Sequence, residues 1–519
     1  PTSPHYEPVL NIVEQTCNRR LEAGEAACFQ NLFHAGRGED RHAVELRRLD
    51  DHCALIRTGD QIELFGASVS GLSRRFGDLE FAGRLVLIGA DRRLLHDATA
   101  SLAGRALAAG TDHDAALAKA LAAAWEAAAP GTAAAAGPSW PGPVLSPRWT
   151  MDLTARPLAV TAFAPPQGGR IVIGHEDGLV RRLDLAGAAD GEFRTDGPVQ
   201  ALLGCDLDGQ PGEELLVGSD DERLYARGHD LAEIWTYRVP FLRDEQPWLW
   251  WTLGKAKVRR LHAADLDGDG RPEILAGCGN MRLHCIDTAG KELWRFRTDH
   301  GICTTLTSAD VFGEGRTRLL AGNGLTSSAG SCWVLDERGK TLQRYYNGSW
   351  CTALPAIAVG DLDGDGKQTV FCGNNRGDVR AYAAVTTPVQ PLWIRNMTRP
   401  IRSLTVLPRP GGAVLAVGSD SGTLCAFDES GALAWRLPLS SAITHTALLR
   451  RGDGVLLAAG CKDGRVFLVT PSGEMAGQAA RPGRLQDLAV VRNAADGTRS
   501  DAVVVVSADP NEVWMLAAP

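Results

Sequence analysis

Acidic residues alternate with glycine in two near-identical loops, and this pattern suits a metal ion. The loops are DLDGDGRPEILAG, which begins at Asp265, and DLDGDGKQTVFCG, which begins at Asp361. Carboxylates at alternate positions of a tight turn converge on one point, and the glycines permit that turn. Because dense oxygen ligands suit Ca²⁺, the sequence predicts structural calcium at these loops.

The predicted metal ligands come from three loops, since DLDGQPGEELLVG repeats the pattern with Gln210 in one acidic position. They are Asp265, Asp267, Asp269 and Glu273; Asp361, Asp363 and Asp365; and Asp206, Asp208 and Glu214. Thr369 stands where the second loop would carry its glutamate. A fourth loop, at Asp310, has Phe312 in place of its second aspartate and is expected to hold no metal. The alternative is that aspartate and glycine serve only the hairpin turns that favour them.

A second group of residues has side chains suited to sugars. The segment FLRDEQPWLWWTLGKAKVRR (241–260) gathers tryptophans and cations in an otherwise acidic chain. Aromatic faces stack on sugar rings, and arginine grips carboxylates through two parallel hydrogen bonds. The candidate substrate-binding residues are Trp248, Trp250, Trp251, Lys257, Arg260, Trp350 and Arg395. They predict an anionic polysaccharide as partner; a structural role for the same residues is the alternative.

The elements that carry these residues recur along the chain. From about residue 154 the sequence repeats an apolar strand, an acidic turn, two further strands and a strand with tryptophan, as at Trp235, Trp294, Trp393 and Trp435. Short alternating strands at a period of 40 to 50 residues are typical of propeller blades. Eight units begin near residues 154, 197, 256, 301, 350, 399, 440 and 483, and seven remains an alternative.

The last unit has only three strands, and a segment before the first unit can complete it. PRWTMDL (147–153) carries Trp149 where other units carry their tryptophan. Closing the ring with this strand removes free sheet edges. The expected fold is therefore all-β: an eight-bladed, alternatively seven-bladed, propeller at 147–519. It follows a small β-rich, sandwich-like domain (1–110) and a helix with a linker (111–146).

The helix is expected over residues 112–129, with Asp112 as its N-cap. Leu117, Leu121 and Trp125 form one apolar stripe, which should dock on a neighbouring domain. In the ring, the acidic turns join first and second strands, whereas segment 241–260 joins two units. The metal loops and the tryptophan-rich segment should therefore lie on opposite faces.

The acidic repeats resemble the FG-GAP/VCBS class of calcium-binding propeller repeats over about residues 150–519. The architecture and residue types also look like those of propeller-type polysaccharide lyases. That resemblance implies β-elimination on a uronate polymer, in which a cation neutralises the carboxylate while other groups move protons. The implied catalytic residues are Arg399, Arg402, His300, His445, Tyr345 and Tyr346.

Residues 25–103 faintly resemble the β-sandwich of heparinase II/III-type lyases, through ACFQNLFHA and LLHDATASL. This resemblance would imply that the helical toroid of that family, with its own catalytic groups, is absent from this chain, which weakens the prediction of an enzyme. A non-catalytic propeller that binds carbohydrate or a partner protein through the same face is the main alternative. A quinone-cofactor dehydrogenase propeller, suggested by the tryptophan strands, ranks last.

Bulk properties narrow the partners. The formal net charge of −8 argues against nucleic acid, and no apolar run is long enough to span a bilayer. Most of the 12 cysteines are expected to be small core residues. Cys278 and Cys285 are the pair expected to face each other across a hairpin, where they can bond in an oxidising compartment. The predicted location is secreted or periplasmic.

Overall fold

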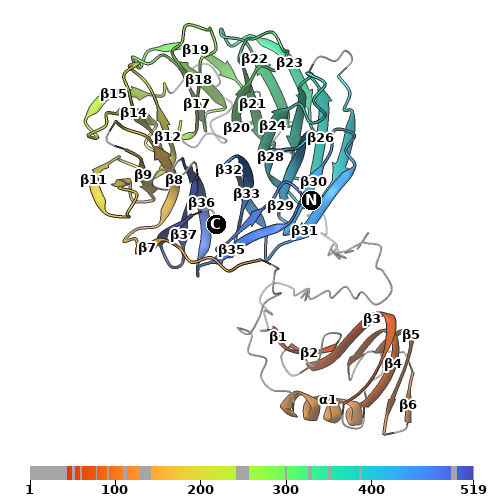
Figure 1. The fold of residues 1–519 in the computed structure, drawn as a ribbon. Coiled ribbons are helices and arrows are strands. Elements are labelled where there is room, and N and C mark those ends of the chain that lie inside the picture. Colours follow the sequence, from red (N-terminus) through yellow and green to blue (C-terminus); the bar gives the residue numbers. More distant parts are fainter. Residues whose placement is uncertain are drawn as a thin grey trace, which may run out of the picture. The chain divides into compact units, whose positions relative to one another are not determined.

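A computed structural model describes the chain in two compact units, residues 1–139 and 140–519. The described residues are 44–48, 53–58, 61–76, 79–89, 93–103, 105–108, 114–127, 142–166, 168–240, 256–298, 301–324, 330–348, 352–384, 389–492 and 500–517. Figure 1 shows the two units, each of which is described by itself.

In the first unit, the described residues form one antiparallel sheet whose strands pair in chain order. The strands are β1 (Val44–Arg48), β2 (Cys53–Thr58), β3 (Gln61–Phe76), β4 (Leu79–Gly89), β5 (Arg93–Leu102) and β6 (Arg105–Leu107). A helix, rather than the second sheet of a sandwich, packs on this sheet in the part of the unit that the structure describes.

The helix α1 (Ala115–Ala127) packs on β3 and β4 of its own unit. Leu117 and Leu121 are fully buried in one apolar cluster with strand residues such as Leu64. The Leu117 N–H donates to Oδ1 of Asp114 at 3.0 Å, so Asp114 is the N-cap and the prediction of Asp112 was wrong. The side chain of Trp125 lies outside the described residues.

The described part of the second unit forms eight four-stranded antiparallel sheets, here numbered in chain order. Sheet 1 is β8 (Pro157–Phe163), β9 (Arg170–His175), β10 (Leu179–Leu183) and β11 (Ala189–Arg194). Sheet 2 is β12 (Val199–Cys205), β13 (Glu214–Ser219), β14 (Arg223–Arg227) and β15 (Glu233–Arg238). Sheet 3 is β16 (Val258–Ala264), β17 (Glu273–Cys278), β18 (Arg282–Ile286) and β19 (Glu292–Arg297). Sheet 4 is β20 (Ile302–Ala309), β21 (Arg318–Gly324), β22 (Ser331–Leu335) and β23 (Thr341–Tyr346).

The remaining four sheets follow the same order, except that the last takes its outer strand from the start of the unit. Sheet 5 is β24 (Ala356–Gly360), β25 (Thr369–Gly373), β26 (Asp378–Ala383) and β27 (Trp393–Asn396). Sheet 6 is β28 (Ile401–Arg409), β29 (Gly412–Ser419), β30 (Thr423–Phe427) and β31 (Leu433–Pro438). Sheet 7 is β32 (Ile443–Arg451), β33 (Gly454–Cys461), β34 (Arg465–Val469) and β35 (Met475–Ala480). Sheet 8 is β36 (Arg484–Val491), β37 (Ala502–Ala508), β38 (Glu512–Ala517) and β7 (Trp149–Asp152).

The sheets close into a ring. The first strand of each sheet contacts the first strand of the next, and β36 contacts β8, as the arrangement in Figure 1 shows. Strand β7 pairs with β38, with Met515 opposite Trp149, so the predicted closure by an N-terminal strand is confirmed. The predicted all-β propeller is confirmed with it.

Burial explains why each strand takes its place in the ring. Second strands such as β13 and β17 are buried at every residue, because neighbouring sheets cover both of their faces. Outer strands such as β15 alternate between exposed and half-buried residues, as expected where one face meets solvent.

Tryptophans of the outer strands connect neighbouring sheets. Trp294 in β19 donates its Nε1–H to the carbonyl of Glu337 at 2.7 Å, and its ring packs on Gly339 of the same turn in sheet 4. A Cβ on Gly339 would approach the ring to 2.6 Å, so only glycine fits there. Equivalent tryptophan–glycine pairs are Trp149–Gly187, Trp235–Gly290, Trp393–Gly431 and Trp435–Gly473.

The eight cysteines whose side chains the structure describes, all between Cys205 and Cys461, are buried and free. Cys278 lies opposite Val258, whereas Cys285 lies opposite Leu275 and Trp294. The prediction that these two cysteines face each other was wrong, because the hairpin register places them at different levels.

Candidate metal loops and ligand face

Three acidic clusters lie in loops that join the first and second strands of sheets 2, 3 and 5. Each set of three residues brings one ligand oxygen apiece to within 4.8 Å of the others. The sets are Asp206, Asp208 and Glu214; Asp265, Asp267 and Asp269; and Asp361, Asp363 and Asp365. In every sheet the first three strands follow the chain and run antiparallel, so the turn between the first and second strands lies at the same end of each sheet. These loops therefore share one face of the ring, here called the metal face.

A buried glutamate supports two of these loops from the first position of the second strand. Oε2 of Glu273 accepts the N–H of Leu266 at 2.8 Å, and Oε2 of Glu214 accepts that of Leu207 at the same distance. Burial is the main cause that raises the pKa of Glu273, and the charges of Asp267, Asp265 and Asp269 raise it further. A divalent cation would relieve this concentration of negative charge, so the donor set fits the predicted ion.

The fourth loop supplies a positive charge of its own. Arg318 occupies the strand position held by Glu273 in sheet 3. Its guanidinium lies 3.2 Å from a carboxylate oxygen of Glu314 and 3.3 Å from one of Glu337. An internal cation therefore stands where the loops of sheets 2 and 3 carry a glutamate. The expectation that the fourth loop holds no metal stays a prediction.

The opposite face, here called the ligand face, carries the turns between second and third strands and the connections between sheets. Segment 241–260 connects β15 with β16, and its described end contains Lys257, whose Nζ lies 2.6 Å from Oδ2 of Asp220. Elsewhere on this face, Arg402 binds Asp420 through two hydrogen bonds of 2.9 and 2.6 Å. Two of the predicted cations are therefore neutralised by aspartates.

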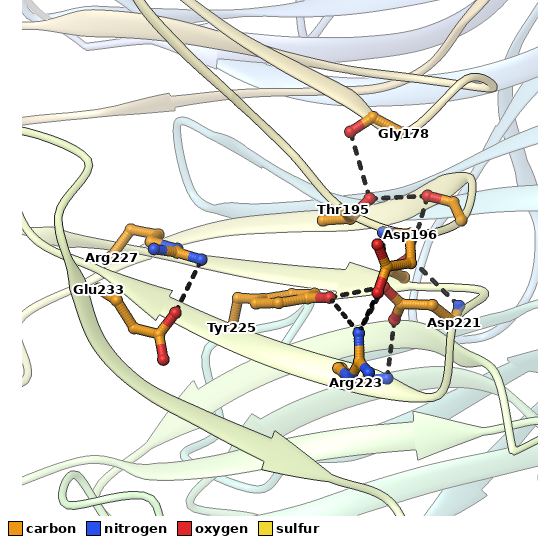
Figure 2. Close-up of polar contacts among 10 residues, drawn as sticks. Gly178, Thr195, Asp196, Asp221, Arg223, Tyr225, Arg227 and Glu233 are labelled. Carbon is orange, nitrogen blue, oxygen red and sulfur yellow. Dashed lines mark hydrogen bonds and ion pairs between the residues drawn. The ribbon is translucent and has the colours of Figure 1, made fainter.

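Figure 2 shows that paired charges also join sheets 1 and 2 on the ligand face. Asp221 accepts hydrogen bonds from the N–H of Asp196 at 3.0 Å and from the hydroxyl of Tyr225 at 2.6 Å. Arg223 bonds to Asp196, and Thr195 donates to the carbonyl of Gly178 at 3.2 Å. Burial is the main cause that raises the pKa of Tyr225 to about 12. This network holds the two sheets together, with the Arg223 guanidinium between the carboxylates of Asp196 and Asp221.

Polar side chains on the first strands of three sheets, β16, β32 and β36, form a group near the ligand face, here called the group at the ring axis. Nε2 of His445 lies 3.4 Å from Oδ1 of Asp487, whose other oxygen accepts the N–H of Val160 at 2.8 Å. The exposed Arg260 donates to the carbonyl of Thr304 at 3.0 Å. Its positive charge acts to lower the pKa of both His445 and Asp487. Burial is the main cause that lowers the pKa of His445 and raises that of Asp487.

Other predicted site residues lie apart from this group. Tyr345 is fully buried in β23, and its hydroxyl donates to the carbonyl of Ala384 at 2.6 Å. Tyr346 follows it with about half of its surface exposed, and Arg344 stacks on its ring. Arg395 in β27 donates to the carbonyl of Gly431, a turn on the metal face. These contacts give Tyr345 and Arg395 packing roles.

Five of the remaining predicted residues fall outside the part of the chain that the structure describes, and one lies on an exposed connection. His300, Trp248, Trp250, Trp251 and Trp350 lie outside the described residues, and Arg399 is exposed in the connection before β28. Sequence reasoning missed Asp487, although its position in an apolar run, LQDLAVV, was a readable signal of a polar contact near the axis.

Two segments of the chain are similar to known protein families. Residues 242–313 match the profile of the λ-carrageenase β-propeller domain. Residues 375–517 match a profile described as outer membrane protein assembly factor BamB. Each match covers less than half of the 519 residues, and a search of curated proteins finds no match.

Similar solved structures are propellers of low sequence identity. Sqt1 from Saccharomyces cerevisiae has a TM-score of 0.55 and 13% identity over 71% of this chain and 98% of its own. Sqt1 from Chaetomium thermophilum, bound to the N-terminus of ribosomal protein L10, has a TM-score of 0.53 and 15% identity, with 70% and 97% covered. The C-terminal WD40 domain of Sif2 has a TM-score of 0.51 and 12% identity, with 73% and 99% covered. These similarities show the fold alone.

The structure contains no helix, among its described residues, with the length and apolar character needed to cross a bilayer.

Proposed function

We propose that this chain is a calcium-stabilised propeller that binds an anionic polysaccharide on its ligand face. One observation carries the proposal: the tryptophan- and cation-rich connection and an acidic loop occur together in one short segment, and the sheet order assigns them to opposite faces. The segment that matches the λ-carrageenase propeller, 242–313, contains the tryptophan- and cation-rich connection and the acidic loop at Asp265. The antiparallel sheet order assigns the two ends of that connection to the face opposite the loop.

The contacts of the predicted cations refine this proposal. Lys257 and Arg402 are paired with aspartates, so their net attraction for an anionic polymer is small. Arg260 and Arg399 are exposed, and the guanidinium contacts described for Arg260 are to carbonyl oxygens. Arg260 is therefore the strongest described candidate to bind a carboxylate or sulfate, and three tryptophans precede it in the sequence of the same segment.

Structural calcium at the three clusters is part of the same proposal. The ligands are the carboxylates of the three sets, and Glu273 supports the set at Asp265. An ion bound there stabilises the hairpins of the metal face while the other face remains available. The match to the profile described as outer membrane protein assembly factor BamB supports a periplasmic or secreted location.

Affinity electrophoresis and calorimetric titration with uronate and sulfated polysaccharides test the binding proposal. Arg260→Gln should weaken binding by about tenfold or more, because it removes one charged hydrogen-bond donor. Arg451→Gln is a matched control, since Arg451 is an exposed arginine in the β32–β33 hairpin on the metal face. Equal losses in both variants, or no binding by the parent chain, would contradict the proposal.

A second candidate function is cleavage of a uronate polymer by β-elimination. The arrangement that favours it is the group at the ring axis, where a cation, Arg260, acts on the same region as His445. A lowered pKa keeps His445 neutral near pH 7, so its imidazole can accept a proton while Arg260 neutralises a carboxylate. Tyr345 cannot take the acid role, because it is buried and its hydroxyl is bonded.

Absorbance of new unsaturated chain ends distinguishes cleavage from binding. His445→Gln should abolish an elimination reaction and leave polymer binding within a factor of a few. Binding without any new unsaturated ends would leave the non-catalytic function. A partner protein is the alternative ligand; Sqt1 from Chaetomium thermophilum, a structure of similar fold, is bound to the N-terminus of ribosomal protein L10.

A further inference from the structure

The acidic loop at Asp361 lacks the glutamate of its sister loops. In sheets 2 and 3, Glu214 and Glu273 occupy the first position of the second strand. In sheet 5 that position is Thr369, which pairs with Gly360 in the same register. Within its own hairpin, this loop therefore offers three aspartates and no fourth carboxylate.

A glutamate from the next sheet contacts the strand position that lacks its own carboxylate. Glu429 belongs to the turn between β30 and β31 of sheet 6, and Oγ1 of Thr369 donates to its Oε1 at 2.6 Å. The backbone of Leu362, the counterpart of Leu266, donates a hydrogen bond toward the Glu429 carboxyl. Burial is the main cause that raises the pKa of Glu429, and the charges of Asp363 and Asp361 raise it further. The aspartates of the Asp361 loop therefore raise the pKa of Glu429, as the aspartates of the Asp265 loop raise the pKa of Glu273.

The position of Glu429 is fixed by other contacts between the same two sheets. Nε1 of Trp393 in β27 donates to the backbone carbonyl of Glu429 at 2.7 Å. The N–H of Ala413 in sheet 6 donates to the carbonyl of Leu362 at 2.8 Å. A Cβ on neighbouring Gly412 would approach that carbonyl oxygen to 2.4 Å. The turn and the acidic loop are therefore held close together.

One oxygen of the Glu429 carboxyl, Oε2, is buried and has no side-chain donor among the described residues. The donors that act on this carboxyl are the Thr369 hydroxyl and the backbone of Leu362. A buried carboxylate with few donors, beside the charges of Asp361 and Asp363, is costly, and a cation beside it would remove the cost. Sheet 4 gives an internal comparison, because Arg318 places a cation between Glu314 and Glu337 at the corresponding position.

We propose that Glu429 completes the calcium site of the Asp361 loop across the sheet boundary, so that this ion joins sheet 5 to sheet 6. The inference rests on the calcium part of the proposed function. In the loop at Asp265 the additional carboxylate is Glu273 of the same hairpin, whereas in the loop at Asp361 it is Glu429 of the neighbouring sheet. The Thr369 hydroxyl orients the Glu429 carboxylate.

Calcium titration calorimetry of the full chain tests this inference, with unfolding followed in Ca²⁺ and in EDTA. Glu429→Gln keeps the size and the acceptor for Thr369 but removes the charge. It should weaken one class of calcium site by about tenfold or more and leave the others unchanged. Glu474→Gln is the matched control, an exposed glutamate in the corresponding turn of sheet 7. It should change no calcium affinity.

A rescue variant separates a lost ligand from a damaged fold. Thr369→Glu combined with Glu429→Gln restores the pattern of the Asp265 loop and should recover the lost affinity. A parent chain that binds no Ca²⁺ would overturn the proposed calcium function and this inference together. A parent chain that binds Ca²⁺, with Glu429→Gln binding equally, would overturn the role of Glu429 alone. Unchanged melting of Glu429→Gln in EDTA would confirm that the variant folds.

Discussion

Single charged residues in this ring are stabilised by partners on neighbouring strands and sheets. Glu292 in β19 is the clearest case. Its carboxylate accepts hydrogen bonds from Tyr237 of sheet 2 at 2.9 Å and from Arg295 at 2.7 Å, and His284 lies 3.4 Å away. The hydrogen bond with His284 is the main cause that lowers the pKa of Glu292 to about 2, although burial opposes it.

This lowered pKa predicts a pH-dependent contribution to stability. Because the folded-state pKa lies below the ordinary value of 4.5, the contribution is complete above about pH 4.5 and is lost as the pH falls towards 2. Urea unfolding at pH 7, 4.5 and 3 should show Glu292→Gln less stable by about 3 kcal/mol at most at pH 7, with the difference shrinking at acid pH. A difference that stays constant with pH would contradict this role.

At the scale of elements, the tryptophan contacts join one sheet to the next. Each contact combines a hydrogen bond to a turn carbonyl with packing on a glycine at positive φ. Gly339 has φ of 74° and the ring of Trp294 above it, whereas Gly411 has φ of 81° and no atom within 4 Å of the place that a Cβ would take. The two glycines share a backbone conformation and differ only in their surroundings.

Alanine at these two glycines should therefore separate backbone strain from packing. Gly411→Ala should cost about 1 kcal/mol for the left-handed conformation. Gly339→Ala should cost about 1–3 kcal/mol more, because Trp294 must move away from its carbonyl partner. Denaturant unfolding of both variants gives the comparison, and equal losses would show that the tryptophan contact contributes little.

Much of this element order was predictable from the sequence. Alternating strands, the repeated tryptophan and Trp149 before the first unit predicted the ring and its closure, and the unit starts lie close to the first strands observed. Contacts between distant residues were not predictable in this way. Glu429 lies 60 residues from Thr369 in sequence, and nothing in its own turn indicates that it faces an acidic loop. The N-cap shifted from Asp112 to Asp114 because either aspartate can cap a helix.

At the scale of the whole molecule, the proposed function assigns structural calcium to one face of the ring and ligand binding to the other. An ion that binds only the folded chain stabilises it by about 2.7 kcal/mol per site at 100 times its Kd. EDTA should therefore lower the Tm, and Asp267→Asn should remove part of the response to Ca²⁺. An equal Tm in Ca²⁺ and EDTA would contradict structural calcium.

The pairing of Lys257 and Arg402 with aspartates was not predictable from the sequence, because each aspartate lies at the end of a different strand from its cation.

Hydrogen–deuterium exchange with and without a bound anionic polysaccharide tests the division of the two faces most directly. The account predicts slower exchange in the ligand face around 256–260, 401–402 and 484–487. It predicts unchanged exchange in the metal loops at 206–214, 265–273 and 361–369 when calcium is constant. Protection centred on the metal loops, with none around Arg260, would contradict it.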